Sequence, residues 1–337
     1  MTDLAAAQKV GKDDLEASLE KYRTELTGYS YRMLGSSFEA EDAVQDAFVR
    51  AWRAYDKFEG RSSLRSWLYR ITTNVCLDML NAGNKRALPM DLTERSHQST
   101  AVLNPQPEVT WLEPVPDSRI LPSTADPAET AVARESVRLA FVAALQHLPP
   151  KQRAVLILRE VLAWKANEVA ELLNTSVASV NSALQRARAT LADSPVKDTD
   201  PADPLDEEQQ DLLNRYMAAF QGYDMKAMAA VLHDDAIMTM PPFDLWLKGH
   251  DDILAFLVNQ GAGCRGSKLL PTFANGTPAF AHYKPDPEDE SRMAPWALQI
   301  IETSGGRITG FHCFLDTKRW FPLFGFPEYL SKADEAQ

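Results

Sequence analysis

Seven prolines within residues 87–127 constrain the fold of this 337-residue chain more than any other feature. They are Pro89, Pro105, Pro107, Pro114, Pro116, Pro122 and Pro127. Proline lacks an amide hydrogen and its ring clashes with the preceding helical turn, so a helix cannot run through this stretch. We therefore predict an extended, Pro-rich linker over residues 87–127 that separates two helical blocks, residues 13–86 and 128–193.

The last block, residues 205–330, mixes helical and strand patterns and is predicted to be an α+β domain with a curved sheet. Helical spacing covers Glu207–Phe220, Met225–Leu232 and His250–Gln260. Apolar runs predict strands at Ala236–Met240, Trp246–Lys248, Leu269–Phe273, Ala279–Lys284, Ala294–Thr303 and Arg307–Leu315. Two dipeptides, Asn275-Gly276 and Gly305-Gly306, predict turns between them.

Composition excludes several classes of protein. The sequence has no run of about 18 apolar residues, so no membrane-spanning helix is expected. Its cysteines, Cys76, Cys264 and Cys313, form no CxxC pair, which argues against a disulfide framework or a zinc site and indicates the cytoplasm. Residues 198–337 hold 11 basic and 22 acidic side chains, so they carry −11 of the net charge of −12. The helical blocks are close to neutral, and bulk charge therefore does not exclude nucleic-acid binding.

The first helical block contains a helix around Glu39–Tyr55 with two different faces. Val44, Ala47, Phe48 and Ala51 recur at helical spacing and predict the buried side. The opposite side carries Asp42, Gln45, Asp46, Val49 and Arg53. Such an acidic face suits docking on a basic partner, although a solvated amphipathic helix explains the same pattern.

The next helix, roughly Ser62–Leu80, combines an apolar stripe with aromatic and basic side chains. The stripe is Leu64, Leu68, Ile71, Val75 and Met79, and the side chains predicted to point away from it are Arg65, Tyr69, Arg70, Thr73 and Asn74. Trp67 lies at the edge. Exposed aromatic rings stack on unpaired bases, arginines bind phosphates and asparagine reads base edges. The helix suits unpaired nucleic acid, unless Trp67 and Tyr69 simply pack in the core.

The second helical block has the layout of a helix-turn-helix. The predicted first helix is Lys165–Leu173, the turn is Asn174–Ser176, and the buried side of the second helix is Val177, Val180, Leu184, Ala187 and Leu191. The other side shows Ser179, Ser182 and Arg186, flanked by Asn181 and Gln185. Small polar residues let a helix lie deep in the major groove. This layout favours DNA binding over a plain helical hairpin.

The two helical blocks resemble regions 2 and 4 of sigma-70 family factors, particularly the extracytoplasmic-function (ECF) group. In the first block the resemblance rests on Glu41-Asp42-x-x-Gln45-x-x-Phe48, on Trp67-Leu68-Tyr69-Arg70-Ile71, and on Asn74 with Asp78. In the second it rests on Leu148-Pro149-x-x-Gln152-Arg153, Glu168-Val169-Ala170 and Ser179-Val180-x-Ser182-x-Leu184-x-Arg186-Ala187. The resemblance implies a factor that directs promoter-specific transcription initiation and is not an enzyme.

The resemblance also implies partners and contact residues. Core RNA polymerase would bind through its β′ clamp helices and β flap, and promoter DNA through its −10 and −35 elements. Polymerase contacts fall on Glu41, Asp42, Gln45 and Asp46. Contacts to the −10 element fall on Arg61, Arg65, Trp67, Tyr69, Arg70 and Asn74, and −35 contacts on Ser179, Asn181, Ser182, Gln185 and Arg186. A repressor that works without polymerase is the weaker alternative, because the recognition helix has few basic residues.

Residues 205–330 resemble a SnoaL-like domain of the NTF2-like superfamily, whose helices pack in a conical sheet. The likeness rests on Met238-Thr239-Met240-Pro241-Pro242, Trp246 and Gly249-His250-Asp251. It implies a built-in regulator with a possible small ligand, and we expect no cofactor, metal or catalytic residue. The polar candidates in the cone are His233, Asp234, Asp235, His282, His312 and Asp316. They show no diagnostic spacing, so a buried, hydrogen-bonded role is favoured for His312. An enzyme acting on a small hydrophobic molecule is the alternative function.

Two apolar segments outside these motifs predict further contacts. Trp111–Asp117 in the linker marks a docking segment, or a loose cover over a neighbouring core. Trp320–Pro327 is densely aromatic and is predicted to cover its own sheet or to clasp another part of the chain.

Overall fold

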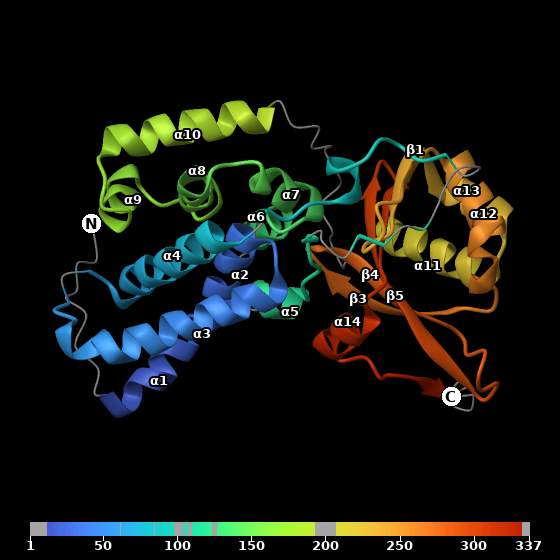
Figure 1. Cartoon of the computed structure of the whole chain (residues 1–337), viewed down its shortest axis with the longest axis horizontal. Helices are drawn as coiled ribbons and strands as arrows, with labels where there is room; N and C mark the ends of the chain where they lie inside the picture. The colour runs from blue at the N-terminus through green and yellow to red at the C-terminus, as the bar shows by residue number, and fades with distance from the viewer. Residues whose placement is uncertain are drawn as a thin grey trace. The chain divides into compact units, whose positions relative to one another are not determined.

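The computed structural model describes residues 12–60, 62–83, 85–97, 103, 105–106, 110–122, 127–192 and 207–331. Contacts divide the chain into two units (Figure 1). The helical unit is formed by Met1–Arg86 with Asp117–Val196, and the mixed unit by Ala87–Pro116 with Lys197–Gln337. The Pro-rich stretch is therefore divided between the units after Pro116.

The helical unit is built from two halves that share one hydrophobic core. The first half contains α1 (Lys12–Glu20), α2 (Arg23–Leu34), α3 (Ser37–Ala54), η1 (Tyr55–Lys57) and α4 (Leu64–Ala82). The second half contains α5 (Asp117–Ile120), α6 (Pro127–Glu135), α7 (Leu139–Gln146), α8 (Pro150–Leu156), η3 (Ile157–Val161), α9 (Ala166–Leu172) and α10 (Val177–Ala192). The predicted helix-turn-helix corresponds to α9 and α10.

Serine side chains cap α3, α4 and α10. The hydroxyls of Ser36, Ser63 and Ser176 each accept a hydrogen bond at 3.1 Å from the backbone N–H three residues later. Each bond satisfies a donor that the first helical turn leaves free, and this fixes where α3, α4 and α10 begin. Gly35 ends α2 with φ of 69°, a left-handed conformation that glycine adopts without strain.

Two close contacts hold the halves of the helical unit together. A Cβ at Gly28 would lie 2.8 Å from the backbone oxygen of Ile120, so glycine is needed where α5 packs on α2. The buried guanidinium of Arg153 in α8 donates to the backbone oxygen of Met33 in α2. It also donates to the side-chain oxygen of Gln146 at 2.7 Å, and to the backbone oxygens of Gln146 and Leu148 at 3.1 and 3.2 Å.

The mixed unit is an α+β domain, as predicted. Its helices are η2 (Pro89–Asp91), α11 (Glu207–Gln221), α12 (Met225–Val231), α13 (His250–Val258), η4 (Gln260–Cys264) and α14 (Thr317–Phe324). Its strands are β1 (Leu232–Thr239), β2 (Trp246–Lys248), β3 (Lys268–Ala274), β4 (Thr277–Pro285), β5 (Arg292–Ser304), β6 (Arg307–Phe314) and β7 (Leu330–Ser331). The sheet order is β2-β1-β6-β5-β4-β3, with β7 on β5, and only the β1–β6 pair is parallel among the described strands.

Opposite faces of this sheet pack against different helices (Figure 1). On the inner face, the ring of Tyr216 in α11 lies 5.7 Å from Phe280 and 6.0 Å from Phe311. On the outer face, Trp320 of α14 packs on Phe314, with ring centroids 6.3 Å apart. The aromatic tail therefore covers its own sheet, which is one of the two roles predicted for it.

The tryptophan segment of the linker docks on the mixed unit. Leu112 and Val115 are buried. The backbone N–H of Val115 donates to the side-chain oxygen of Asn275 in the β3–β4 turn, and the backbone N–H of Asn275 donates to the backbone oxygen of Val115. Glu113 forms an ion pair at 2.8 Å with Arg319 of α14. This confirms the predicted docking segment and places its contact within the described part of the mixed unit.

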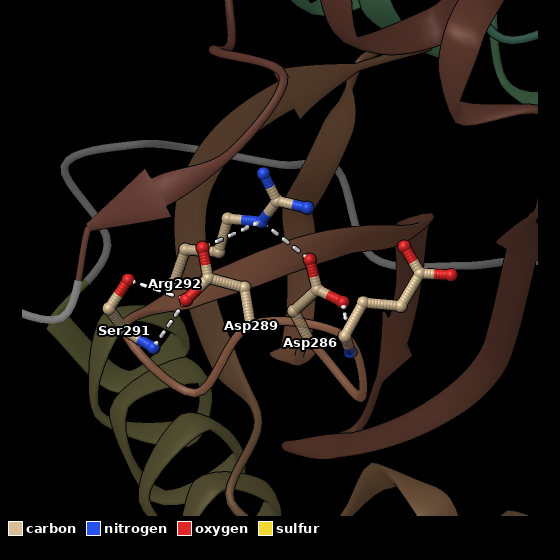
Figure 2. A network of polar contacts seen from close by, with 5 residues as sticks. Asp286, Asp289, Ser291 and Arg292 are labelled. Carbon is tan, nitrogen blue, oxygen red and sulfur yellow. Dashed lines mark hydrogen bonds and ion pairs between the residues drawn. The ribbon is translucent and has the colours of Figure 1, made fainter.

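The turn between β4 and β5 is fixed by a polar network (Figure 2). Asp286 accepts hydrogen bonds from the side chain of Arg292 at 2.6 Å and from the backbone N–H of Glu288 at 2.9 Å. Asp289 accepts from the backbone and hydroxyl of Ser291 at 2.9 and 2.6 Å. Arg292 also lies 4.0 Å from the ring centroid of Tyr329, so one arginine links the turn to the segment before β7.

Candidate functional site

The outer face of α3 carries an acidic side chain, Asp42, that pairs with no described residue. Val44, Ala47, Phe48 and Ala51 are buried as predicted, which leaves Asp42 on the opposite, exposed side. Asp42 and its neighbour Gln45 are exposed and have no hydrogen bond or ion pair with any described residue. Asp46 differs, because it forms an ion pair with Arg50 at 2.8 Å. Asp42 and Gln45 are therefore available to a partner without breaking an internal bond.

Two hollows of about 500 Å³ flank this face, one on each side of Gln45. One of them is lined by two exposed apolar side chains, Val49 and Trp52, which are 36% and 40% exposed. Val49 was predicted to lie on this face, whereas Trp52 was given no role; both follow Asp42 and Gln45 at helical spacing. We call Asp42, Gln45, Val49 and Trp52 the α3 stripe. Exposed apolar side chains beside unpaired polar ones are typical of an interaction surface.

The linker helix α5 covers one edge of the α3 stripe. Arg119 of α5 forms an ion pair with Glu41, and both residues line the second hollow together with Asp42. Among the described residues, Glu41 is thus the only predicted polymerase-contact residue on α3 that forms an ion pair with the linker. Charge alone could not reveal this pair, because 78 positions separate its members.

On α4, the predicted exposure of Thr73 was wrong, and for Tyr69 the alternative, packing in the core, is confirmed. Both side chains are fully buried instead of facing solvent. The Tyr69 ring packs edge-on against Tyr29 at 5.3 Å and against Trp164 at 5.0 Å. Trp164 lies between η3 and α9, so the second half of the helical unit provides the cover that the sequence of α4 alone could not indicate.

The remaining α4 residues differ in how freely they can reach a ligand. Arg65 is paired with Glu25 at 2.9 Å, and its guanidinium lies 5.1 Å from the Tyr69 ring centroid. Arg70 reaches Glu171 of α9 at 3.5 Å, and Trp67 is half-buried against Phe58, with centroids 4.8 Å apart. Asn74 is exposed and unpaired with any described residue. Arg61 lies outside the described residues.

The recognition helix α10 presents all five predicted contact residues to solvent. Ser179, Asn181, Ser182, Gln185 and Arg186 are exposed. The hydroxyl of Ser179 lies 2.9 Å from that of Ser176, so this side chain also takes part in the cap. Val180, Leu184 and Ala187 are buried as predicted, but Val177 is 42% exposed, and its neighbours Ala178 and Ser179 in the first turn of α10 are exposed as well.

In the mixed unit, His282 lies in a hydrogen-bonded chain of neutral groups. Tyr216 donates to Gln299 at 2.9 Å, Gln299 donates to Nδ1 of His282 at 2.9 Å, and Nε2 of His282 donates to Ser267 at 2.7 Å. The Ser267 hydroxyl in turn donates to the backbone oxygen of Cys264 at 2.6 Å. Burial, reinforced by the nearby charge of Lys284, lowers the pKa of His282 to about 3.

The other polar candidates of this unit are not brought together. His312 lies on the outer face, where Nδ1 is 3.0 Å from the hydroxyl of Thr239 and Nε2 is 3.5 Å from Glu302. It is buried and hydrogen-bonded, as favoured from the sequence. His233 accepts from the backbone of Asp235, while Asp234, Asp235 and Asp316 are exposed. Across the described ranges, no three His, Cys, Asp or Glu side chains are grouped so that they could hold a metal ion.

The pKa of His282 leads to a testable pH dependence. In the unfolded chain a histidine takes up a proton near pH 6.5, whereas folded His282 stays neutral down to about pH 3. The unfolded state therefore binds more protons in this window, and stability falls as the pH is lowered, by up to ~1.4 kcal/mol per pH unit. We expect His282→Gln to give a flatter stability curve between pH 7 and pH 4 in urea denaturation. His147→Gln, at an exposed position, is the control; equal slopes for wild type and His282→Gln would contradict the assignment.

The comparisons with known proteins match this arrangement of domains. Residues 19–86 match the Sigma-70 region 2 family, residues 138–191 match Sigma-70, region 4, and residues 213–311 match the SnoaL-like domain. The chain is 44% identical over 322 residues to the ECF RNA polymerase sigma factor SigG of Mycobacterium tuberculosis (strain ATCC 25618 / H37Rv), an alignment that covers 95% of this chain and 85% of SigG. This chain belongs to the ECF RNA polymerase sigma factors.

A second ECF sigma factor aligns with most of this chain, including the helical and the mixed unit. SigJ of Mycobacterium tuberculosis (strain ATCC 25618 / H37Rv) is 27% identical over 299 residues, covering 86% of this chain and 88% of SigJ. The crystal structure of Mycobacterium tuberculosis SigJ has the same fold, with a TM-score of 0.59, 23% identity, and coverage of 93% of this chain and 99% of SigJ. The predicted fold class and the predicted function, a sigma factor for transcription initiation, are confirmed. Among its described residues, this ECF sigma factor has no helix that is long and apolar enough to span a bilayer.

Proposed function

We propose that this ECF sigma factor binds core RNA polymerase through the α3 stripe and reads promoter DNA through α4 and α10. The observation that carries the proposal is that Asp42 and Gln45 are exposed and pair with no described residue, beside the apolar Val49 and Trp52. A carboxylate next to an aromatic ring is suited to a basic surface with an apolar centre, such as the β′ clamp helices. Glu41 and Asp46 would join the contact after exchanging their internal partners.

We further propose that α4 binds the −10 element only after the two halves of the helical unit separate. Arg65 lies over the rings of Tyr69 and Trp164, at 5.1 and 5.6 Å from their centroids, and Arg70 contacts Glu171. These side chains cannot stack on bases or bind phosphates while they hold one another. Movement of α8 and α9 away from α4, driven by polymerase binding to both halves, would release Arg65, Tyr69 and Arg70. Asn74 and Trp67 would complete the −10 surface, and α10, with the β flap as its neighbour, would read the −35 element.

Arg119→Ala should strengthen binding to core polymerase by up to about fivefold. The exposed Arg119–Glu41 pair is worth no more than about 1 kcal/mol, but its loss frees Glu41 for the partner. Affinity can be measured by fluorescence titration of labelled sigma factor with core enzyme. Arg215→Ala, which breaks a comparable exposed pair with Asp211 in α11, should leave the affinity unchanged. Weaker binding of Arg119→Ala would mean that Arg119 itself contacts polymerase.

We propose that the SnoaL-like domain modulates the sigma activity and does not itself perform acid–base chemistry. Both ring nitrogens of His282 are occupied by Gln299 and Ser267, and its lowered pKa keeps the imidazole neutral. A general base needs a free lone pair near the proton that it removes, and His282 has none. An enzyme acting on a small hydrophobic molecule is therefore the less supported alternative. The place of action that we propose is the cytoplasm, where the polymerase works.

Transcription in vitro with purified core polymerase tests the whole proposal. The full chain should give promoter-specific transcripts, and a chain shortened after residue 196 should give a transcript yield that differs by severalfold if the SnoaL-like domain modulates activity. Equal yields from the two forms would remove the modulating role. Absence of specific transcripts from both forms on a matched promoter would contradict the proposed interfaces.

A further inference from the structure

A partly enclosed cavity of about 140 Å³ lies inside the mixed unit, between the inner face of the sheet and helices α11 and α13. Its wall is largely apolar, with Met238 from β1, Phe256 from α13 and Phe311 from β6. An engineered apolar cavity of about 150 Å³ binds benzene. The space in this domain therefore accepts one six-membered ring with a small substituent.

A β-bulge aims an aromatic side chain at this cavity. His282 pairs with Ala297, whereas the next residue of β4, Tyr283, pairs with Pro295, so Trp296 is the extra residue on β5. A bulge turns the side chain away from the regular alternation of the strand. Trp296 accordingly lines the cavity on the same side as Gln299. The indole forms a flat wall against which a second ring can stack.

Lys284 provides the cavity with a positive charge that has no counter-ion among the described residues. Its ammonium nitrogen lies 3.3 Å from the ring centroid of Trp296, and it is the only charged side chain among the described residues that line the cavity. No described carboxylate pairs with it. Burial lowers the pKa of Lys284, as expected for an ammonium group partly removed from water. A ligand carboxylate beside this nitrogen would replace the lost solvation.

His282, another polar side chain in the cavity wall, does not compete with Lys284 for a ligand. His282 is neutral and its two nitrogens are already bonded to Gln299 and Ser267. It adds a rigid polar wall without attracting a cation or offering a proton. The net negative charge of the domain acts from outside the cavity, where salt screens it over a Debye length of about 8 Å.

We propose that this cavity binds a small molecule with one apolar ring and one carboxylate, with the ring against Trp296 and Phe311 and the carboxylate on Lys284. The site goes beyond the sigma activity, and its occupancy does not depend on the polymerase and promoter surfaces proposed above. The bound molecule is held and not converted.

Calorimetric titration of the full chain with three matched probes tests the site. Benzoate, benzyl alcohol and benzylamine share the ring and differ in charge; each is titrated to about 10 mM, within reach of the affinity expected for so few atoms. We expect one benzoate per chain, bound at least about tenfold more tightly than benzyl alcohol, and no saturable binding of the benzylammonium ion. Lys284→Met should lower benzoate affinity to that of benzyl alcohol. Lys318→Met, at an exposed position on α14, should leave it unchanged.

The probe series decides the question in the wild-type chain even if a variant proves unstable. No saturable benzoate binding, or equal affinity for the three probes, would overturn the proposal. Unchanged benzoate affinity in folded Lys284→Met would overturn it as well. Because these outcomes are read without polymerase, they are distinguishable from a failure of the transcription assay.

Discussion

Arg153→Met should lower the free energy of unfolding of the helical unit by about 3 kcal/mol. The guanidinium makes four hydrogen bonds, to Met33, Leu148 and twice to Gln146, and methionine replaces none of them. Bonds from a charged donor are each worth about 1.5 kcal/mol or more. Removing the charge also recovers desolvation: burial lowers the pKa of Arg153 to about 10, a cost on the order of 3 kcal/mol. The bonds outweigh this gain, because their acceptors stay buried without donors.

Urea denaturation followed by far-ultraviolet circular dichroism measures this effect. Lys151→Met, two residues earlier on α8 and exposed, is the matched control and should change stability little. The double variant Arg153→Met with Gln146→Ala should cost less than the sum of the two single changes, because both remove the same bond. Equal stability of Arg153→Met and wild type would show that the buried charge is no better than an apolar side chain at this position.

Six of the seven described strands of the mixed unit were predicted from sequence, because their pattern is local. Trp246–Lys248 has the predicted bounds, and β3 to β6 each lie within three residues of theirs at either end. The turns at Asn275-Gly276 and Gly305-Gly306 also occur as predicted, with positive φ at all four residues. The alternation of apolar and polar residues in a strand, and the residue types that form a turn, can both be recognised from neighbouring residues. The bulge that places Trp296 in the cavity depends on the pairing of β5 with β4, and no local sequence pattern predicts it.

The site was harder to predict because its key contacts join distant segments. The spacing of α4 gives a sound account of its core stripe, but Tyr69 is covered by Trp164, almost a hundred residues away in sequence. Arg119, which lies inside the Pro-rich stretch, forms an ion pair with Glu41 of α3. The hydrophobic period identifies which side of α3 faces away from the core, but it does not show which residues on that side pair with another segment of the chain. The helical period of α3 is sufficient to predict that the apolar side chains Val49 and Trp52 are exposed together.

Asp42→Arg should weaken binding to core polymerase by about 10- to 100-fold. Asp42 is exposed and unpaired within the described residues, so reversing its charge breaks no internal bond and the folded state should keep its stability. At a basic partner surface the change replaces attraction by repulsion at close range, which costs far more than the loss of one exposed ion pair. The effect should shrink as salt is raised, since exposed charges are screened.

The control for Asp42→Arg is Glu129→Arg, an equal change in net charge at an exposed position on α6, away from the α3 stripe. If long-range steering alone governed association, both variants would weaken binding alike, because the field of the whole unit counts net charge and not position. A loss confined to Asp42→Arg, together with an unchanged melting temperature, would locate the contact on α3. Gln45→Ala then separates charge from shape: as an uncharged neighbour it should cost severalfold less, with no dependence on salt. Equal affinities for wild type and Asp42→Arg would mean that the acidic face of α3 is only a solvated surface.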